Sequence, residues 1–216
     1  MTAESRDRAA GPAPPGGRKA GRRPGERATR DEIHEAARSA FAEHGYDRAT
    51  IRDIASRARV DPALVIHYFG SKEQLFSAAL RLPVEPAEVL ARVRAQAPDE
   101  MGPALVRAFL SVWEPEETRT PLIATLRSAM TNETAMTLVR EHLDRRIFGP
   151  ITAALQSDDA ELRATLIGSQ LIGLAMMRYI AGVQPLASAS VEQLVAAVGP
   201  TVQRYITGDL GGAADA

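Results

Sequence analysis

The sequence of 216 residues contains no cysteine. Disulfides, thiolate metal sites and cysteine nucleophiles are therefore excluded. The sequence also lacks a long hydrophobic run, because the longest one, from Ala164 to Met177, is interrupted by Ser169 and Gln170. This run is shorter than the ~20 apolar residues that a membrane-spanning helix needs. It predicts a buried helix, and we expect no membrane partner.

Other absences narrow the class of function. The first thirty residues contain no apolar segment of the kind found in secretory signals, so we expect a cytoplasmic protein. No nucleophile elbow, phosphate-binding glycine loop or pair of catalytic carboxylates is apparent, which argues against an enzyme. The four histidines include no pair at the spacing of metal ligands on a helix. We therefore expect neither a metal nor another cofactor.

Charge is distributed unevenly along the chain, although the net charge is only −1. Lysine is scarce and occurs only at Lys19 and Lys72. The part through Lys72 has fourteen Lys and Arg against ten Asp and Glu, and the remainder has twelve against seventeen. A basic first part and an acidic second part indicate a nucleic-acid partner on one side of the molecule.

The N-terminal 82 residues divide into two segments. Residues 1–26 are rich in Pro, Gly and Arg and predict a disordered basic arm. Such an arm either enters a minor groove or remains solvated and adds non-specific affinity for DNA. Residues 27–82 predict short helices: Gly45 ends the first, Thr50 caps the second, Asp61 with a following proline begins the third, and Ser71 caps a fourth.

Residues 83–216 form the third predicted segment. Helical patterns fill this segment, with proline or glycine at the expected breaks, including Pro121. No alternating strand pattern and no internal repeat is present, so we predict an all-α fold.

Several spaced blocks in the second segment resemble the signature of the tetracycline-repressor (TetR) family. They are residues 50–55, residues 60–65 and residues 67–76, the last reading HYFGSKEQLF. Residues 40–46 match the end of the first helix of that family. The resemblance covers roughly residues 27–80.

The resemblance implies a two-domain, all-helical subunit. An N-terminal three-helix helix-turn-helix domain would bind DNA, and a C-terminal helical domain over residues 83–216 would bind a ligand and dimerise. It further implies a homodimer on a palindromic operator in double-stranded DNA. The implied function is a ligand-responsive transcriptional regulator, most often a repressor, released by a small apolar effector.

The resemblance also assigns DNA contacts, with the helix from Pro62 to Tyr68 in the major groove. The small apolar side chains of that helix can contact thymine methyl groups but cannot form a bidentate bond to guanine. Arg52 would supply base readout, a phosphate contact or a surface salt bridge. The predicted DNA-binding residues are Thr50, Arg52, Pro62, Ala63, Leu64, Ile66, His67, Tyr68 and Lys72.

Two positions in this segment involve an energetic conflict. Lys72 begins a helix, where its charge opposes the helix dipole, and a bound phosphate would relieve this conflict. The alternative is a solvated surface lysine. Arg59 stands where the family usually has glycine, and a left-handed backbone there would cost ~1 kcal/mol and alter the turn before the recognition helix.

Methionine and aromatic residues of the C-terminal segment either form an ordinary core or line an apolar cavity, as the resemblance implies. The candidate pocket residues are Phe109, Trp113, Met130 and Met176, with Arg127 as a polar anchor.

The helix expected over residues 159–181 is apolar on nearly all sides, so something beyond its own domain must cover it. Gly168 and Gly173 in its interior indicate that a neighbouring backbone comes close, either in a partner subunit or in the same subunit. The predicted dimer residues on this helix and on the last helix are Leu166, Gly173, Ile180, Leu194, Val198 and Val202.

Two rival functions remain open from the sequence. One is a small helical enzyme, against which the missing catalytic motifs count. The other is a structural protein that coats DNA, which would show no preference for a palindrome.

Overall fold

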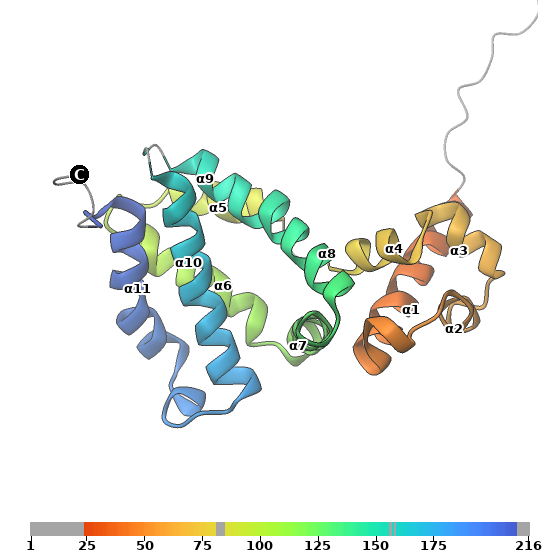
Figure 1. The fold of residues 1–216 in the computed structure, drawn as a ribbon. Coiled ribbons are helices and arrows are strands. Elements are labelled where there is room, and N and C mark those ends of the chain that lie inside the picture. Colours follow the sequence, from red (N-terminus) through yellow and green to blue (C-terminus); the bar gives the residue numbers. More distant parts are fainter. Residues whose placement is uncertain (1–23, 81–84, 156, 158, 211–216) are drawn as a thin grey trace, which may run out of the picture.

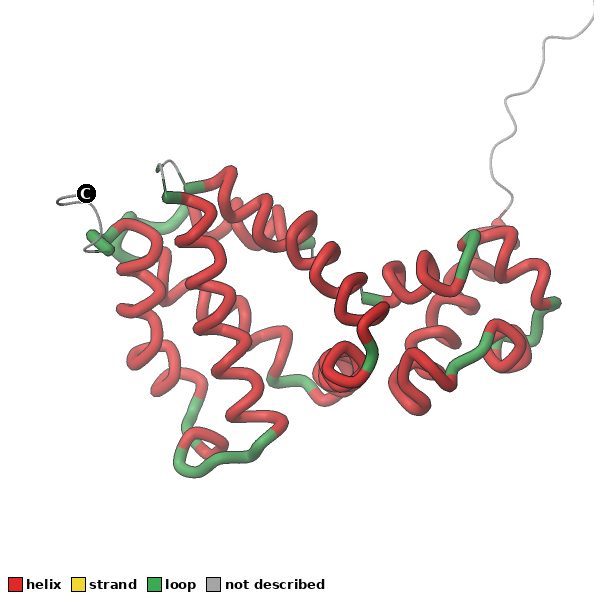
Figure 2. The backbone as a smooth tube through the Cα atoms, in the orientation of Figure 1, coloured by secondary structure: helices red, strands yellow, loops and turns green. Residues whose placement is uncertain are grey.

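The computed structural model describes residues 24–80, 85–155, 157 and 159–210. Helices and their connections account for these residues, and no strand occurs among them (Figure 2). The all-α prediction is confirmed. The predicted basic arm, residues 1–26, lies almost entirely outside the described residues.

Four helices form one end of the molecule, which we call the head (residues 28–80; Figure 1). They are α1 (Pro24–Arg48), α2 (Ile51–Arg57), α3 (Pro62–Phe69) and α4 (Lys72–Ala79). Side-chain oxygens of Thr50, Asp61 and Ser71 accept backbone N–H bonds of 3.1, 2.7 and 3.2 Å at the starts of α2, α3 and α4. Each bond satisfies a donor that the first helical turn would otherwise leave unpaired.

Three residues with positive φ, Gly45, Arg59 and Gly70, lie at the connections between these helices. Gly45 has a non-helical backbone (φ 72°, ψ 176°), so the first helical run ends at this glycine as predicted, and a short second run continues α1 to Arg48. Arg59 adopts φ 56° in the turn before α3. The turn therefore keeps the left-handed backbone that glycine would favour, with arginine in its place.

The core of the head is a cluster of aromatic rings. The ring of Phe76 lies 5.0 Å from the rings of both Phe41 and Tyr46, edge to face in each case. Val65 and Phe69, the buried face of α3, join the same cluster. Such ring geometry adds to the stabilisation that burial alone provides.

The remaining helices form a larger part, which we call the body (residues 85–210; Figure 1). Its elements are α5 (Pro86–Arg94), α6 (Met101–Trp113), α7 (Glu116–Thr131), α8 (Glu133–Leu143), a π-helical turn (Asp144–Phe148), α9 (Gly149–Ala154), α10 (Ala160–Ala175), a second π-helical turn (Met176–Ile180), a short 3₁₀ turn (Leu186–Ser188) and α11 (Val191–Thr207). Pro121 was predicted to mark a break but lies inside α7, so that prediction is wrong.

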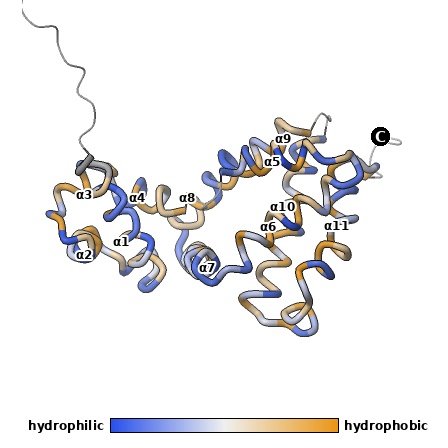
Figure 3. The backbone as a smooth tube through the Cα atoms, turned by 180° about the vertical axis from the view of Figure 1, so that it is seen from behind, coloured by the Kyte–Doolittle hydropathy of each residue, from blue (hydrophilic) through white to orange (hydrophobic). Residues whose placement is uncertain are grey.

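Helices α6 and α11 cross closely because glycine stands at the crossing. A Cβ atom on Gly102 would lie 2.5 Å from the carbonyl oxygen of Gly199, and one on Gly199 would lie 3.0 Å from the ring of Pro103. Hydrophobic residues predominate along α6 and α10, whereas α7 is more hydrophilic (Figure 3). Among the described helices, none has the length and apolar character needed to cross a membrane.

Candidate nucleic-acid interface and ligand cavity

Helix α3 has one buried and one exposed face. Val65 is fully buried and Phe69 is 8% exposed, so these two residues, four apart, anchor the helix to the head. The opposite face carries the DNA-binding residues predicted for this helix, of which His67 and Tyr68 are predicted to contact phosphates. Pro62, Ala63, Ile66 and His67 are exposed there, and Leu64 and Tyr68 are half-buried.

Ile66 is the notable member of this exposed face, with 43% of its surface exposed. This large apolar side chain is not part of the described hydrophobic core of the head. The arrangement is suited to contact with a thymine methyl group.

Two predicted DNA-binding residues lie at the start of α2. The hydroxyl of Thr50 accepts the N–H of Asp53, so Thr50 fixes the beginning of the helix as well as being exposed. Arg52 is exposed one residue into α2. The neighbouring Arg57 is held in ion pairs with Glu43 (2.8 Å) and Asp53 (3.0 Å), which leaves Arg52 as the cation that projects from the start of α2.

Lys72 has defined partners within the head. Its Nζ donates to the carbonyl oxygen of Asp47 (3.3 Å) and lies 4.5 Å from the centre of the Tyr46 ring. Burial lowers the pKa of Lys72, although the charges of Asp47 and Glu73 oppose this effect. The ammonium group is thus positioned at the start of α4 and is not a freely solvated lysine.

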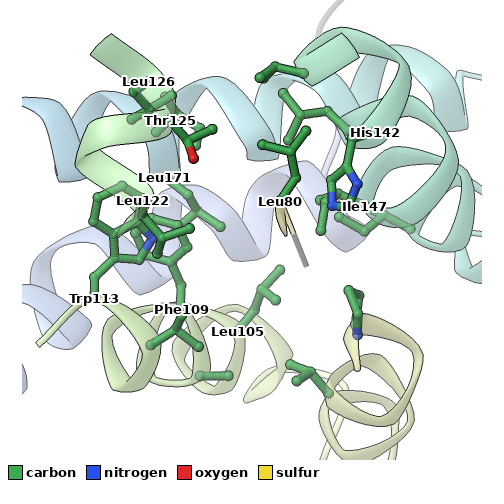
Figure 4. Close-up of a pocket in the computed structure, with 18 of the residues that line it drawn as sticks. Leu80, Leu105, Phe109, Trp113, Leu122, Thr125, Leu126, His142, Ile147 and Leu171 are labelled. Carbon is green, nitrogen blue, oxygen red and sulfur yellow. The ribbon is translucent and has the colours of Figure 1, made fainter. Parts of the chain in front are cut away.

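The body contains an apolar cavity of about 230 Å³ (Figure 4). Its walls come from the end of α4, from α5 to α10 and from the first π-helical turn. The lining residues are Leu80, Pro86, Val89, Leu90, Leu105, Ala108, Phe109, Val112, Trp113, Leu122, Thr125, Leu126, Val139, His142, Leu143, Ile147, Ile151, Leu171 and Ile172.

Two of the five predicted pocket residues, Phe109 and Trp113, line this cavity. Arg127, Met130 and Met176 do not, which corrects their assignment. Arg127 and Met130 lie on the exposed side of α7, with Met130 67% exposed, because Leu122 and Leu126 turn the other side of that helix inward. Met176 is half-buried beyond the end of α10.

Most of the cavity wall, including its two polar residues, Thr125 and His142, was not predicted from the sequence. Thr125 stands between Leu122 and Leu126 on α7, at helical spacing from Leu122. His142 lies three residues after Val139 on α8. A single polar residue within an apolar helical stripe was the signal that could have identified them.

Trp113 contacts a polar cluster of Tyr179, Glu114 and Arg178. Its ring stacks on Tyr179 at 5.8 Å, and Glu114 accepts bonds of 2.8 Å from both the Tyr179 hydroxyl and Nη2 of Arg178. Burial opposes ionisation of Glu114, but these hydrogen bonds and the arginine charges prevail, so its pKa is lowered. Burial and the bond to Glu114 raise the pKa of Tyr179 to about 12.

Helices that line the cavity also contact the head. The Tyr46 N–H donates to Oγ of Ser128 on α7 (3.2 Å), and Nδ2 of Asn132, the cap of α8, donates to Oδ1 of Asp47 (2.7 Å). Leu80 belongs to the head core and lines the cavity as well. A ligand in the cavity would therefore touch helices that set the position of the head.

Comparisons with known proteins agree with this architecture. The family model described as "Bacterial regulatory proteins, tetR family" matches residues 33–79, and "Tetracyclin repressor-like, C-terminal domain" matches residues 99–206. A crystal structure of a TetR-family regulator from Streptomyces coelicolor A3 has 39% sequence identity and a TM-score of 0.64. That match covers 87% of this chain and 99% of the other. The chain belongs to the TetR family of transcriptional regulators.

Two curated relatives of this TetR-family regulator differ in how much of their length matches. The regulator BetI of Rhizobium meliloti is 31% identical over 174 residues, which cover 77% of this chain and 84% of BetI. The repressor AcnR of Corynebacterium efficiens is 45% identical over 53 residues, 24% of this chain and 28% of AcnR. The likeness to AcnR is thus confined to a short segment.

The predicted dimer residues of this TetR-family regulator are placed unequally. Gly173 and Ile180 are exposed, and Leu166 and Val198 are half-buried. Leu194 and Val202 are 3% and 0% exposed within the subunit, which corrects their assignment. The close crossing of α6 and α11 turns this stripe of α11 inward, so neither side chain is available to a partner.

The two interior glycines of α10 have different surroundings. A Cβ atom on Gly168 would lie 2.3 Å from the Phe148 ring of the same subunit, so this glycine serves internal packing. A Cβ atom on Gly173 would meet nothing within 4 Å. The alternative that Gly173 packs against its own subunit is therefore wrong.

Proposed function

We propose that this TetR-family regulator is a ligand-responsive repressor. It binds a palindromic operator as a homodimer, and a small apolar effector in the body cavity releases it. The observation that carries the proposal is that α7 and α8 wall the cavity and also contact the head, while Leu80 at the end of α4 belongs to the head core and lines the cavity. The name of AcnR, a transcriptional repressor, supports repression as the direction of regulation.

In the proposed mechanism the ligand acts by population shift and without chemistry. The unliganded dimer holds its two α3 helices at a separation that matches successive major grooves, about 34 Å apart. A ligand that fits the cavity better in another arrangement of α4, α7 and α8 lowers operator affinity by the ratio of its affinities for the two states.

A homodimer is supported by an uncovered apolar face on α10 and the turn that follows it. Leu162, Met177 and Ile180 are 55%, 46% and 41% exposed on one subunit, and Gly173 leaves room there for another backbone. Two such faces paired about a two-fold axis would give an apolar interface of the obligate kind.

The operator is obtained by selection from a random DNA library, and affinity is then measured by fluorescence anisotropy. Selected sites should be inverted repeats, and Lys72→Ala should weaken binding to all sequences alike and reduce the salt slope by about one. Leu64→Ala and Ile66→Ala should relax preference at particular base pairs, by ~1–3 kcal/mol per position. Selected sites without symmetry, or equal losses on operator and random DNA for Leu64→Ala and Ile66→Ala, would contradict the proposal.

The dimer is tested with a pair of glycine variants. Gly173→Leu should give a folded monomer that loses operator binding, because the added side chain meets open space in its own subunit. Gly168→Leu, the matched control, should lower the melting temperature because it collides with Phe148. Sedimentation and thermal melts separate these outcomes, and a Gly173→Leu protein that stays dimeric would remove this face from the interface.

A further inference from the structure

The walls of the cavity restrict the chemistry of its ligand beyond what the proposed function states. Of the nineteen described lining residues, seventeen are apolar, and the other two are Thr125 and His142. No arginine, lysine, aspartate or glutamate is among them. At about 230 Å³ the cavity is somewhat below the ~300–1,000 Å³ typical of ligand pockets.

Such a wall disfavours an ionised ligand. A carboxylate, phosphate or ammonium group that enters loses its hydration, and the described wall contains no permanent charge to compensate. A hydroxyl or carbonyl group needs only one or two hydrogen bonds to offset the loss of water. The cavity can supply such a bond from the Thr125 hydroxyl.

The two polar side chains are directed into the same space. Figure 4 shows the hydroxyl oxygen of Thr125 pointing from α7 toward the middle of the cavity, and the imidazole of His142 reaching in from α8 on the other side. The Thr125 hydroxyl both donates and accepts, and the imidazole of His142, which also has an interaction within the protein, lies opposite it. A single neutral polar group beside Thr125 can therefore be bound as a donor or as an acceptor.

We infer that the effector is an uncharged, largely apolar molecule whose one hydrogen-bonding group lies between Thr125 and His142. This inference rests on the proposed function, because it names the class of ligand for the same cavity. The inference also identifies a residue that connects the ligand to the head. His142 lines the cavity and also the cleft between α1 of the head and α8 of the body. The polar end of the ligand would thus contact the residue that borders both spaces.

The chain carries its own reporter for occupancy. Trp113 is the only tryptophan in the sequence, and it lines the cavity. Its fluorescence therefore measures binding at this site directly, in the full-length protein and without DNA.

Matched eight-carbon probes test the charge of the ligand, each kept below the concentration at which it forms micelles. Octanol should change Trp113 fluorescence with an affinity at least about ten-fold higher than octanoate or octylamine, because only the neutral head group keeps its hydrogen bonds. An octanoate or octylamine affinity equal to that of octanol would overturn the inference. So would the absence of a response to octanol at saturation.

A pair of threonine variants tests the position of the polar group. Thr125→Val removes the hydroxyl with little change in shape and should weaken octanol binding about three- to ten-fold. It should leave 1-chlorooctane, which has no hydroxyl, within about two-fold. Thr120→Val on the exposed side of α7 is the control and should change neither. Equal losses for octanol and chlorooctane would show that Thr125 contributes only shape.

Anisotropy with the selected operator separates failure of this inference from failure of the proposed function. If octanol occupies the cavity but operator affinity is unchanged, the ligand class stands and the proposed release mechanism fails. If octanoate, and not octanol, both binds and releases the operator, the release mechanism stands and the neutral ligand class fails.

Discussion

The head and the body are built from the same kind of helix but are stabilised differently. In the head, α2, α3 and α4 each begin with a side-chain cap, and aromatic rings fill the core. In the body, α8 and α11 have side-chain caps, but α5, α6, α7, α9 and α10 begin without one, and the space between the helices includes a cavity. Short-range signals therefore specify more of the helix starts in the head than in the body, where packing between distant segments has the larger share.

The π-helical turns sharpen this contrast. Both occur in the body, at Asp144–Phe148 and Met176–Ile180, and the first contributes Ile147 to the cavity wall. Such turns are rare and often lie at functional sites, because they interrupt the regular hydrogen-bond ladder. The body thus combines irregular helical turns with a cavity, whereas no π-helical turn occurs in the described residues of the head.

The largest predicted effect compares the loss of one phenylalanine ring in the head with the loss of one in the body. Phe76→Ala in the head removes a ring that is 1% exposed and contacts two others, and it should cost ~3–5 kcal/mol of unfolding free energy. Phe109→Ala, the matched change in the body, borders an existing cavity and is half-buried, so its cost should be clearly smaller. Urea unfolding of both variants measures the difference. Equal costs would mean that the body is packed as tightly as the head.

The same contrast explains what could be predicted from the sequence. The start of α3 followed from Asp61 and Pro62, and its buried face from Val65 and Phe69, because caps and helical spacing act within a few residues. The exposed face of α3 followed from the same periodicity, whereas its predicted contact with the major groove came from the resemblance to the TetR family. The resemblance to TetR regulators covered this region most closely.

The cavity and the dimer interface were harder to predict from the sequence, because both depend on contacts between distant segments. Leu194 and Val202 form an obvious apolar stripe on α11, but the glycines at its crossing with α6 decide that this stripe faces inward. Arg127 and Met130 were chosen by residue type, whereas α7 is oriented by Leu122 and Leu126. Residue type alone does not determine which side of a helix faces a cavity.

Helix caps provide the next largest test. Asp61→Ala removes the 2.7 Å bond to the Ala63 N–H at the start of α3 and should cost ~1 kcal/mol, with a matching loss of operator affinity. Glu85→Ala at the start of α5, where no side-chain cap bond exists, should change stability by less than ~0.5 kcal/mol. Thermal melts of both variants check this. A larger loss at Glu85 would contradict the view that the start of α5 does not depend on a cap.

Acid titration tests the cluster behind Trp113. The pKa of Glu114 is lowered below its ordinary value of 4.5 in the folded protein, despite its burial, by hydrogen bonds from Tyr179 and Arg178. Its contribution to stability is therefore present above that value and is lost as the pH falls through the lower, folded value. Glu114→Gln should reduce the loss of stability between about pH 5 and pH 3, relative to Glu117→Gln, an exposed control. The measurement is the unfolding free energy across this pH range, with Trp113 fluorescence as the signal. If the cluster is unimportant, Glu114→Gln will have the same pH dependence as the unchanged protein.

The smallest expected effect is at Arg59, and it tests whether the head contains a local strain that its good caps compensate. The residue is exposed and has φ 56°, a conformation that costs ~1–2 kcal/mol for a residue with a Cβ atom. Glycine removes this cost but adds ~0.4–1 kcal/mol of unfolded-state entropy, so Arg59→Gly should stabilise the head by less than ~1 kcal/mol. Arg59→Ala separates charge from conformation, because alanine removes the charge and keeps the strain, and it should not raise stability. Urea unfolding of the three proteins decides the matter: a gain in both variants would assign the effect to charge, and a loss in Arg59→Gly would mean that the arginine side chain makes a favourable contact.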